Sequence, residues 1–435
     1  MTQRLEAALE AIDKTILVKH AQCIKGQRVT MSEPFSAGEY WICFEMIAED
    51  GDLIIARVRL PRHPDVPSSL AEEEEAYAIQ CELAAMKLVK KRLPAIPVPT
   101  VYAYEGHGSQ LAADVGAIYM LMEGFYGNTL VDVAKDMCSL PLARSGTLTA
   151  IDQSPTQEHI ITQWTRVQAE LATLKFDKIG AIASVSDSGE AKIGKLPGVD
   201  DGDLPGNGPL STASDFFMCI VNTAENIVAN TSSPANRDSN GGSVSALALA
   251  AVVFRDIIKR TPLFDDVGVD GHFPLNHMDL GAKNILVDDD FNFVAIIDWE
   301  FAQTAPWQVN CYPKSFPQLG FSDEAILRDP THPAYNAALR EEAARRMYNK
   351  KFRDAERQLE DKERGLGASF AETLDSPASR IYACFNDIAH SADGEDDKLD
   401  LVRAMARLAF GLDEIETERL WPLDLSYLDS CIAAS

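Results

Sequence analysis

Strand-like and helical patterns occupy different parts of this chain of 435 residues, and this separation limits its fold more than any other feature. Residues 40–50 and 52–61 are two apolar runs that flank an acidic turn with a glycine, which predicts a β-hairpin. Two further strand-like runs, 101–106 and 117–125, follow a long helical pattern, with a glycine-rich loop expected between them. The rest of the chain has mainly helical periodicity. We therefore predict an α+β fold, in which a small antiparallel sheet carries one helix and precedes a larger helical region.

Helical patterns account for most of the remaining residues. Residues 1–22 predict a helix that docks on another element. Ser69–Arg92 predicts a long helix with acids in its first turn and bases in its last, as the helix dipole favours. Further helices are expected at 156–176, 244–261, 323–365 and 376–418. Residues 185–213 are rich in Gly, Asp and Pro and predict a long irregular loop.

The charge of the chain excludes several classes of partner. Lys and Arg number 40 and Asp and Glu number 66, which gives a formal net charge of −26. Nucleic acids and anionic membranes bind clustered positive charge, so neither partner is expected, whereas a cationic ligand is permitted. The longest apolar run, Ala246–Phe254, is too short to span a bilayer. The acids Glu6 and Glu10 are unlike a secretory signal or a transit peptide, and we expect a cytoplasmic protein.

The segment with the most chemical information runs from Asn276 to Trp307. Residues 284–287 and 293–297 are two apolar runs joined by a polar turn that contains three consecutive aspartates. This pattern predicts a second β-hairpin, with its turn centred on Phe291.

Four polar residues surround this predicted hairpin. With the turn at Phe291, Asn284 and Asp298 would lie opposite each other across the two strands, and Asp279 would lie in the loop that enters the hairpin. An Asn and an Asp side by side provide the oxygen ligands that suit Mg²⁺, and the remaining carboxylate can accept a proton. Either His277-x-Asp or an Asp-rich turn is common by chance, but their joint occurrence around one hairpin indicates a catalytic site.

The motif H-x-D-x-x-x-x-N, followed by I-I-D-W-E, resembles the catalytic core of the aminoglycoside phosphotransferase-like small-molecule kinases, in the form found in a large fungal set. These enzymes share the protein-kinase fold. The resemblance implies a two-lobed protein-kinase-like fold that uses ATP and Mg²⁺. It implies that Asp279 is the catalytic base and that Asn284 and Asp298 bind Mg²⁺ on the nucleotide phosphates. It assigns His277 to the organisation of the catalytic loop.

The family also has a basic residue on the third strand and an acid on the helix that follows. Arg57 and Arg59 lie on one face of a predicted strand, because side chains alternate with period two. The resemblance favours Arg57 as the phosphate contact, with Arg59 as the alternative. Glu82 has the family's spacing to Ile96–Pro99, whereas Glu72–Glu75 are interpreted as a solvated helix start. We therefore expect an ion pair between Arg57 and Glu82.

Residues 119–125 resemble the hinge that joins the two lobes of such kinases. By this resemblance the backbone groups of Glu123 and Phe125 bind adenine, and Met122 lies behind the adenine ring. The implied segments are an N-terminal helical extension at 1–30, a nucleotide-binding lobe at 31–124, and a helical lobe at 125–435 that contains the catalytic loop at 276–307.

Several positions depart from the protein-kinase pattern. The loop expected to cover the phosphates has the single glycine Gly38, and Gly281 stands where protein kinases place a Lys after the catalytic Asp. Pro306 follows Asp298 so closely that no activation loop fits between them. These departures disfavour a protein kinase and favour a kinase that phosphorylates a hydroxyl of a small molecule.

Two classes of function remain. The first is an active ATP-dependent phosphotransferase, and the second is a catalytically silent kinase-like protein that works by binding. The presence of Asp279, Asn284 and Asp298 favours the enzyme. The acceptor is not named by the motifs, and its contacts are expected in the C-terminal helices and in 185–213. Acids in these regions are either solvated or attract a cationic acceptor; they are Asp200, Asp201, Asp203 and Glu395–Asp397.

Overall fold

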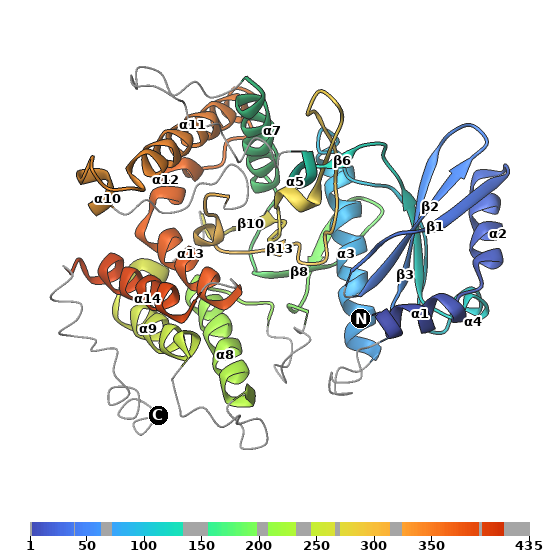
Figure 1. Ribbon diagram of the computed structural model, residues 1–435, viewed down its shortest axis with the longest axis horizontal. Coiled ribbons are helices and arrows are strands. Elements are labelled where there is room, and N and C mark those ends of the chain that lie inside the picture. Colours follow the sequence, from blue (N-terminus) through green and yellow to red (C-terminus); the bar gives the residue numbers. More distant parts are fainter. Residues whose placement is uncertain are drawn as a thin grey trace. The chain divides into compact units, whose positions relative to one another are not determined.

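The computed structural model describes residues 2–38, 40–61, 72–133, 155–197, 208–231, 245–265, 270–313, 324–390 and 394–412. The chain divides into two compact units (Figure 1). The first comprises Met1–Leu142, Ile182–Lys192 and Asp279–Ala302, and the second comprises Ala143–Ala181, Ile193–Met278 and Gln303–Ser435. This division groups residues 279–302 with the first unit, whereas the sequence pattern assigns them to the helical segment.

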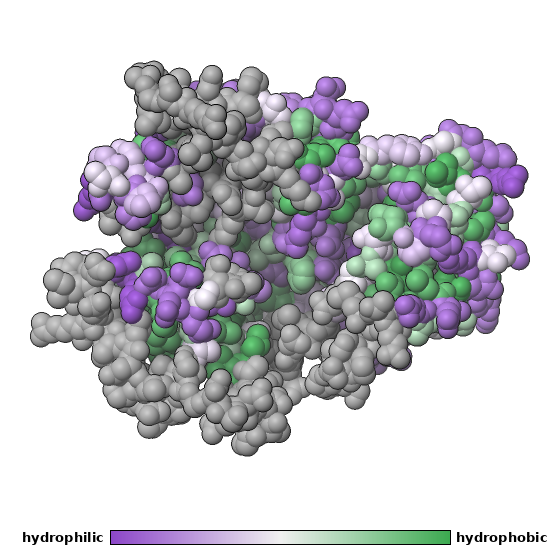
Figure 2. All heavy atoms as spheres, in the orientation of Figure 1, coloured by the Kyte–Doolittle hydropathy of each residue, from purple (hydrophilic) through white to green (hydrophobic). Residues whose placement is uncertain are grey.

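The first unit contains a five-stranded antiparallel sheet with the order β1-β2-β3-β5-β4. The strands are β1 (Val29–Ala37), β2 (Trp41–Ala48), β3 (Leu53–Arg59), β4 (Val101–Glu105) and β5 (Tyr119–Glu123). The predicted hairpin of β2 and β3 is confirmed, and Gly51 has the positive φ of 88° that its turn requires. The sequence pattern missed β1, because this edge strand is largely exposed and does not alternate apolar with polar residues. Hydrophilic residues cover the outer ends of β1 and β2 on the face seen in Figure 2.

Two helices begin the first unit where one was predicted. They are α1 (Thr2–Ala11) and α2 (Lys14–Lys25). The helical conformation is interrupted before α2 at Asp13. The Asp13 side chain accepts a hydrogen bond of 2.8 Å from the Thr15 amide and so caps α2. A helix breaks at this point because a capping Asp satisfies the free amides of a new first turn.

Two further helices frame the sheet. The predicted long helix is α3 (Glu72–Arg92), and its predicted cap, Ser69, lies outside the described residues. A short helix, α4 (Gln110–Val115), occupies the segment predicted as a loop. Ser109 caps its start and Gly116 ends it with a φ of 86°.

The two faces of the sheet have different partners. One face forms a core with α1, α2 and α4 that includes Leu17, Ile54 and Val58. The helix α3 lies on the other side of the sheet (Figure 1). Because strand residues alternate, Arg57 and Arg59 face α3 while their neighbours enter the core.

The second predicted hairpin is present but its register differs by one residue. It consists of β11 (Ile285–Val287) and β12 (Phe293–Ile296), and β11 also pairs with β6 (Asn128–Thr129), which precedes the short helix α5 (Leu130–Val133). Val294 is an extra residue in β12, since Leu286 pairs with Ala295 and Val287 pairs with Phe293. The turn is centred on Asp290 instead of Phe291, and together with this extra residue it leaves Asn284 opposite Ile297, whose amide donates to the Asn284 carbonyl at 3.0 Å. The predicted pairing of Asn284 with Asp298 is therefore wrong.

The second unit is mainly helical, as predicted. Its helices are α7 (Pro155–Ala172), α8 (Ala213–Thr231), α9 (Ala246–Arg260), α10 (Glu324–Arg328), α11 (Tyr335–Glu360), α12 (Phe370–Asp375), α13 (Pro377–His390) and α14 (Glu395–Phe410). Each of the two long C-terminal helices that the sequence predicted is divided: α10 and α11 occupy 323–365, and α13 and α14 occupy 376–418, where Gly394 precedes α14. The short helix α12, capped by Ser369, lies between the two predicted segments. Aromatic side chains from α8, α9 and α13 form its largest core, among them Phe217, Phe254 and Phe385.

Short strands form one more sheet, with the order β7-β10-β13-β8-β9. The strands are β7 (Lys175–Phe176), β8 (Gly180–Val185), β9 (Ala191–Ile193), β10 (Phe273–Asn276) and β13 (Gln303–Thr304). The strand β9 lies in the segment predicted as an irregular loop. The predicted α+β class, with an antiparallel sheet and a separate helical region, is confirmed. No helix of the described residues is long and apolar enough to cross a bilayer.

Candidate functional site

A buried ion pair joins the central strand of the sheet to α3. Nη1 of Arg57 lies 2.7 Å from Oε1 of Glu82, and the two side chains are only 12% and 2% exposed. The predicted ion pair between these residues is confirmed. Burial removes both charges from water, so each depends on the other to remain satisfied.

Two more groups hold the Arg57 guanidinium in place. Its Nη2 lies 3.6 Å from Oδ1 of Asp298, and its Cζ lies 4.8 Å from the centre of the Trp41 ring. Burial lowers the pKa of Arg57, but attraction to Glu82 and Asp298 outweighs burial and raises it above its ordinary value. A permanently charged guanidinium is thus fixed beside the second aspartate of the motif.

A second ion pair runs parallel to the first. Nε of Arg59 lies 2.7 Å from Oε1 of Glu75, and Trp41 lies beside this guanidinium as well, at 5.0 Å. The interpretation of Glu75 as part of a solvated helix start is wrong, because its side chain is 12% exposed and paired. Glu75 and Glu82 are two helical turns apart on one face of α3, which matches two arginines on one face of β3.

We expect the ion pair of Arg57 and Glu82 to be strongly coupled. Replacing Glu82 with Gln should lower the free energy of unfolding by roughly 3 kcal/mol, because it leaves a buried guanidinium without its nearest carboxylate. Urea unfolding measures the change. Replacing exposed Glu73 with Gln on the same helix is the control and should have little effect. The double variant with Glu82→Met and Arg57→Met should recover part of the free energy of unfolding that the single variants lose. A loss in the double variant equal to the sum of the two single losses would contradict the coupling.

The loop after β10 brings three polar side chains of the motif together. Nδ2 of Asn284 donates to both the backbone O and Oδ2 of Asp279, at 2.8 and 3.0 Å. Nζ of Lys283 lies 2.9 Å from the same Oδ2. The Asp279 side chain remains 31% exposed, so it is accessible as well as oriented.

Lys283 is a residue that the sequence analysis missed. Its hydrogen bond with Asp279 raises the pKa of the Lys283 ammonium, with a smaller opposing effect of burial. The only sequence signal is the spacing of four residues between an Asp and a Lys, which is common on any helical turn. Lys283 lies on the 3₁₀ turn Ala282–Asn284, which places its positive charge beside Asp279.

The loop after β12 presents Asp298 in an uncommon backbone conformation. Asp298 has a φ of 65°, which few residues other than Gly adopt. The next residue, Trp299, is buried and its Nε1 donates to the Ile296 carbonyl at 2.8 Å, which anchors the loop. Burial, and then the carboxylates of Asp298 and Glu82, raise the pKa of Glu300 to about 7.

Two side chains of this region carry oxygen atoms of the kind that bind Mg²⁺. Mg²⁺ usually binds through one or two carboxylates together with waters and phosphates. Asp298 provides one carboxylate, and Asn284 provides Oδ1, since its Nδ2 is occupied by Asp279. Within the described ranges, no three His, Cys, Asp or Glu side chains gather as a metal site. The donors therefore suit a metal that a nucleotide completes, not one enclosed by protein ligands.

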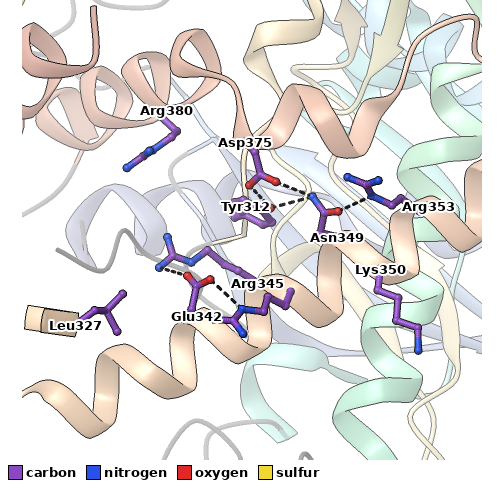
Figure 3. A pocket seen from close by; sticks show the side chains of 10 residues that line it. Tyr312, Leu327, Glu342, Arg345, Asn349, Lys350, Arg353, Asp375 and Arg380 are labelled. Carbon is purple, nitrogen blue, oxygen red and sulfur yellow. Dashed lines mark hydrogen bonds and ion pairs between the residues drawn. The ribbon is translucent and has the colours of Figure 1, made fainter. Parts of the chain in front are cut away.

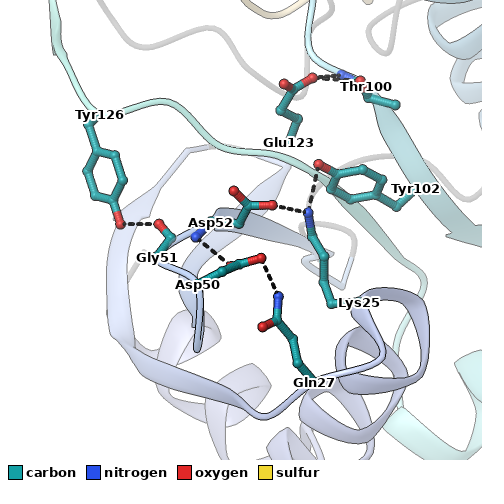
Figure 4. Close-up of polar contacts among 9 residues, drawn as sticks. All are labelled: Lys25, Gln27, Asp50, Gly51, Asp52, Thr100, Tyr102, Glu123 and Tyr126. Atoms are coloured by element: carbon teal, nitrogen blue, oxygen red, sulfur yellow. Dashed lines mark hydrogen bonds and ion pairs between the residues drawn. The ribbon is translucent and has the colours of Figure 1, made fainter.

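The segment predicted as a hinge ends strand β5. Met122 is buried, and the Glu123 side chain accepts from the amide and hydroxyl of Thr100 at 2.9 and 2.6 Å (Figure 4). Burial raises the pKa of Glu123, but these bonds and Lys90 outweigh burial and lower it. Gly124 packs so closely on Leu53 that an added Cβ would lie 2.5 Å from its Cγ. Both the side chain and the amide of Glu123 are thus engaged by Thr100, since the Glu123 amide donates to the Thr100 carbonyl at 2.8 Å.

Two predicted hinge and loop residues have simpler surroundings. Among the described residues, no backbone partner is found for the amide of Phe125, which stands two residues after the end of the ladder between β3 and β5. His277 directly follows β10 and is 2% exposed.

Comparisons with known proteins give no family. No protein-family model matches the sequence, and no curated protein matches it. A solved structure of a putative fructosamine-3-kinase from Thermobifida fusca is similar at 14% identity and a TM-score of 0.43, over 90% of this chain and 98% of that chain. A type I macrolide 2'-phosphotransferase gives 15% and 0.36, over 91% and 98% of the two chains. An amicoumacin kinase in complex with AMP-PNP and Ca²⁺ gives 12% and 0.39, over 94% and 96%.

Proposed function

We propose that this protein is an ATP-dependent phosphotransferase with a protein-kinase-like fold, which transfers the γ-phosphoryl group to a hydroxyl of a small molecule. The observation that carries the proposal is the meeting of Arg57, Glu82 and Asp298, which come from three distant segments of the chain. An ordinary structural salt bridge would need only Arg57 and Glu82. The third, Asp298, also belongs to the motif that contains Asp279 and Asn284.

Each residue has a role that follows from its charge and surroundings. Arg57, held by Glu82 and Trp41, would orient the α- and β-phosphates through charge-assisted hydrogen bonds. Asp279 would accept the proton of the acceptor hydroxyl, and Asn284 keeps its carboxylate oriented. Lys283 would stabilise the negative charge that develops during transfer.

Asn284 and Asp298 would hold Mg²⁺, which when bound neutralises charge on the nucleotide phosphates. The rigid arrangement of Arg57 and Asp298 reduces the cost of organising these groups when the nucleotide arrives. The proposal places the adenine against the backbone of Glu123 and Phe125, with Met122 behind it. It retains 31–124 as the nucleotide-binding lobe and 125–435 as the lobe of the acceptor.

The acids considered for a cationic acceptor give no support to that class. Glu395 accepts a hydrogen bond of 2.8 Å from the Ala246 amide, at the start of α9, so it has a structural contact. Asp200, Asp201 and Asp203 lie outside the described residues. The proposal therefore names the acceptor group, a hydroxyl of a small molecule, and not its charge.

A catalytically silent binding protein is the competing function. Thermal unfolding with and without Mg-ATP tests the nucleotide site, and ATP consumption with a panel of hydroxyl metabolites tests turnover. We expect a rise in Tm with Mg-ATP and consumption above background with at least one metabolite. A rise in Tm without turnover on any metabolite would favour the silent protein. If Mg-ATP caused no rise in Tm and no ATP were consumed, the nucleotide site itself would be contradicted.

A further inference from the structure

A cavity of about 480 Å³, lined mostly by charged and polar residues, lies within the second unit among α10, α11, α12 and α13 (Figure 3). It is lined by Tyr312, Leu327, Glu342, Arg345, Arg346, Asn349, Lys350, Arg353, Asp375 and Arg380. Its volume is in the range of sites that hold small metabolites, roughly 300–1,000 Å³. None of its residues belongs to the site described above, so its chemistry needs a separate explanation.

One face of α11 provides most of this lining. Glu342, Arg345, Arg346, Asn349, Lys350 and Arg353 recur at helical spacing and form a polar stripe. The adjacent face carries the buried side chains of Tyr348 and Phe352. A stripe at this spacing is ordinarily apolar when it faces other helices, whereas here it is cationic and lines a cavity.

Positive charge exceeds negative charge in the cavity. Its lining includes five bases, Arg345, Arg346, Lys350, Arg353 and Arg380, against two acids, Glu342 and Asp375. The surplus is unusual in a chain whose net charge is −26. An excess of arginines that line a hollow favours an anionic ligand.

The two acids do not cancel this surplus. Glu342 is shared by two guanidiniums, with Arg345 Nη2 at 3.4 Å and Arg346 Nε at 3.1 Å. Asp375 instead accepts from neutral donors, the Tyr312 hydroxyl at 2.6 Å and Asn349 Nδ2 at 2.9 Å. One carboxylate thus serves two cations, and the other serves none of the cations shown in Figure 3.

Asn349 also fixes the position of a guanidinium in the cavity. Its Nδ2 donates to Asp375 and to the Ala371 carbonyl, both at 2.9 Å, so the amide is held between α11 and α12. Its Oδ1 accepts from Nε of Arg353 at 2.9 Å. Within the part of the chain that the structure describes, neither Arg353 nor Lys350 has an ion-pair partner, so the two Nη groups and the ammonium can bind a ligand.

We propose that this cavity binds a small anionic molecule with phosphate or carboxylate groups, with Arg353 and Lys350 as its main contacts. Both groups accept the paired hydrogen bonds that a guanidinium donates. The proposal goes beyond the phosphotransferase activity, since it needs neither a nucleotide nor turnover.

The test is calorimetric titration of the full chain without nucleotide, using inorganic phosphate, glucose 6-phosphate and citrate as probes. We expect saturable binding of at least one probe. Arg353→Gln and Lys350→Gln should each weaken it at least about tenfold, the scale of one lost hydrogen bond to a charged group. Both side chains are exposed, so unfolding midpoints should be unchanged. Binding of the phosphate probes alone identifies a phosphate ligand, and binding of citrate alone identifies a carboxylate ligand.

The matched control is Arg357→Gln. Arg357 is exposed, lies one turn beyond Arg353 on α11, pairs with Asp354 and does not line the cavity. The Arg357→Gln substitution removes the same charge as Arg353→Gln and should change the affinity for the probes by less than about twofold. Absence of saturable binding to every probe would overturn the proposal. An equal loss of affinity in Arg357→Gln would also overturn it, because it would indicate nonspecific attraction of charge. A loss of affinity in Arg57→Gln but not in Arg353→Gln would overturn it as well, because the probes would then bind at the nucleotide site.

Discussion

Replacing Asp279 with Asn is expected to lower kcat by about 10²–10⁴-fold, the usual scale for the loss of a general base. The acceptor hydroxyl must be aimed at the γ-phosphorus and must lose its proton during transfer. Asp279 is the partly exposed carboxylate beside Asn284 and Lys283 that can do both. An Asn has the same shape without the base, so the affinity for Mg-ATP should change little.

Turnover on an acceptor from the metabolite panel, together with titration of Mg-ATP, measures both quantities. Asp289→Asn is the control, because Asp289 is an exposed acid in the turn of the same hairpin and has no proposed role. Undiminished turnover in Asp279→Asn would remove the catalytic assignment. A drop of the same size in Asp289→Asn would indicate a general effect of hairpin charge instead.

Replacing Asp298 with Asn should have a different effect and weaken Mg-ATP binding itself. Loss of groups that merely orient a metal's ligands costs 10–100-fold in metal affinity, and loss of the charged ligand should cost at least about as much. Asn is the appropriate replacement because, like Asp, it tolerates the φ of 65° at this position. The loop backbone is therefore expected to survive the change.

The roles of the two aspartates are distinguished by comparing the affinity of each variant for Mg-ATP with its affinity for metal-free ADP. We expect Asp298→Asn to lose affinity for Mg-ATP much more than for metal-free ADP, and Asp279→Asn to lose neither. Equal losses of nucleotide affinity in both variants would mean that the roles of the two residues are assigned wrongly. A loss for metal-free ADP as large as for Mg-ATP would show that Asp298 acts through Arg57, its neighbour at 3.6 Å, and not through a metal.

The sequence alone was sufficient for features that depend on local periodicity. Alternation on β3 placed Arg57 and Arg59 on one face, whereas Glu82 was assigned as the partner of Arg57 through the resemblance to the kinase family. The hairpin of β11 and β12 was also predictable, because apolar runs around an Asp-rich turn form strands wherever they find a partner. Short helices such as α4 were missed, since a cap and one turn carry too little periodicity to be recognised.

Only the tertiary structure decided which residues meet across separate elements. The turn is centred on Asp290 instead of Phe291, and with the extra residue Val294 this leaves Asn284 opposite Ile297; no composition rule locates such a turn or bulge. Glu75 looked solvated because its neighbours are acids, yet the face of α3 that meets β3 made it a partner of Arg59. The cavity of α11 likewise depends on Asp375 and Tyr312, which helix packing brings to Asn349. Local spacing specifies which face a side chain occupies, whereas the partner on that face is chosen by how the elements pack.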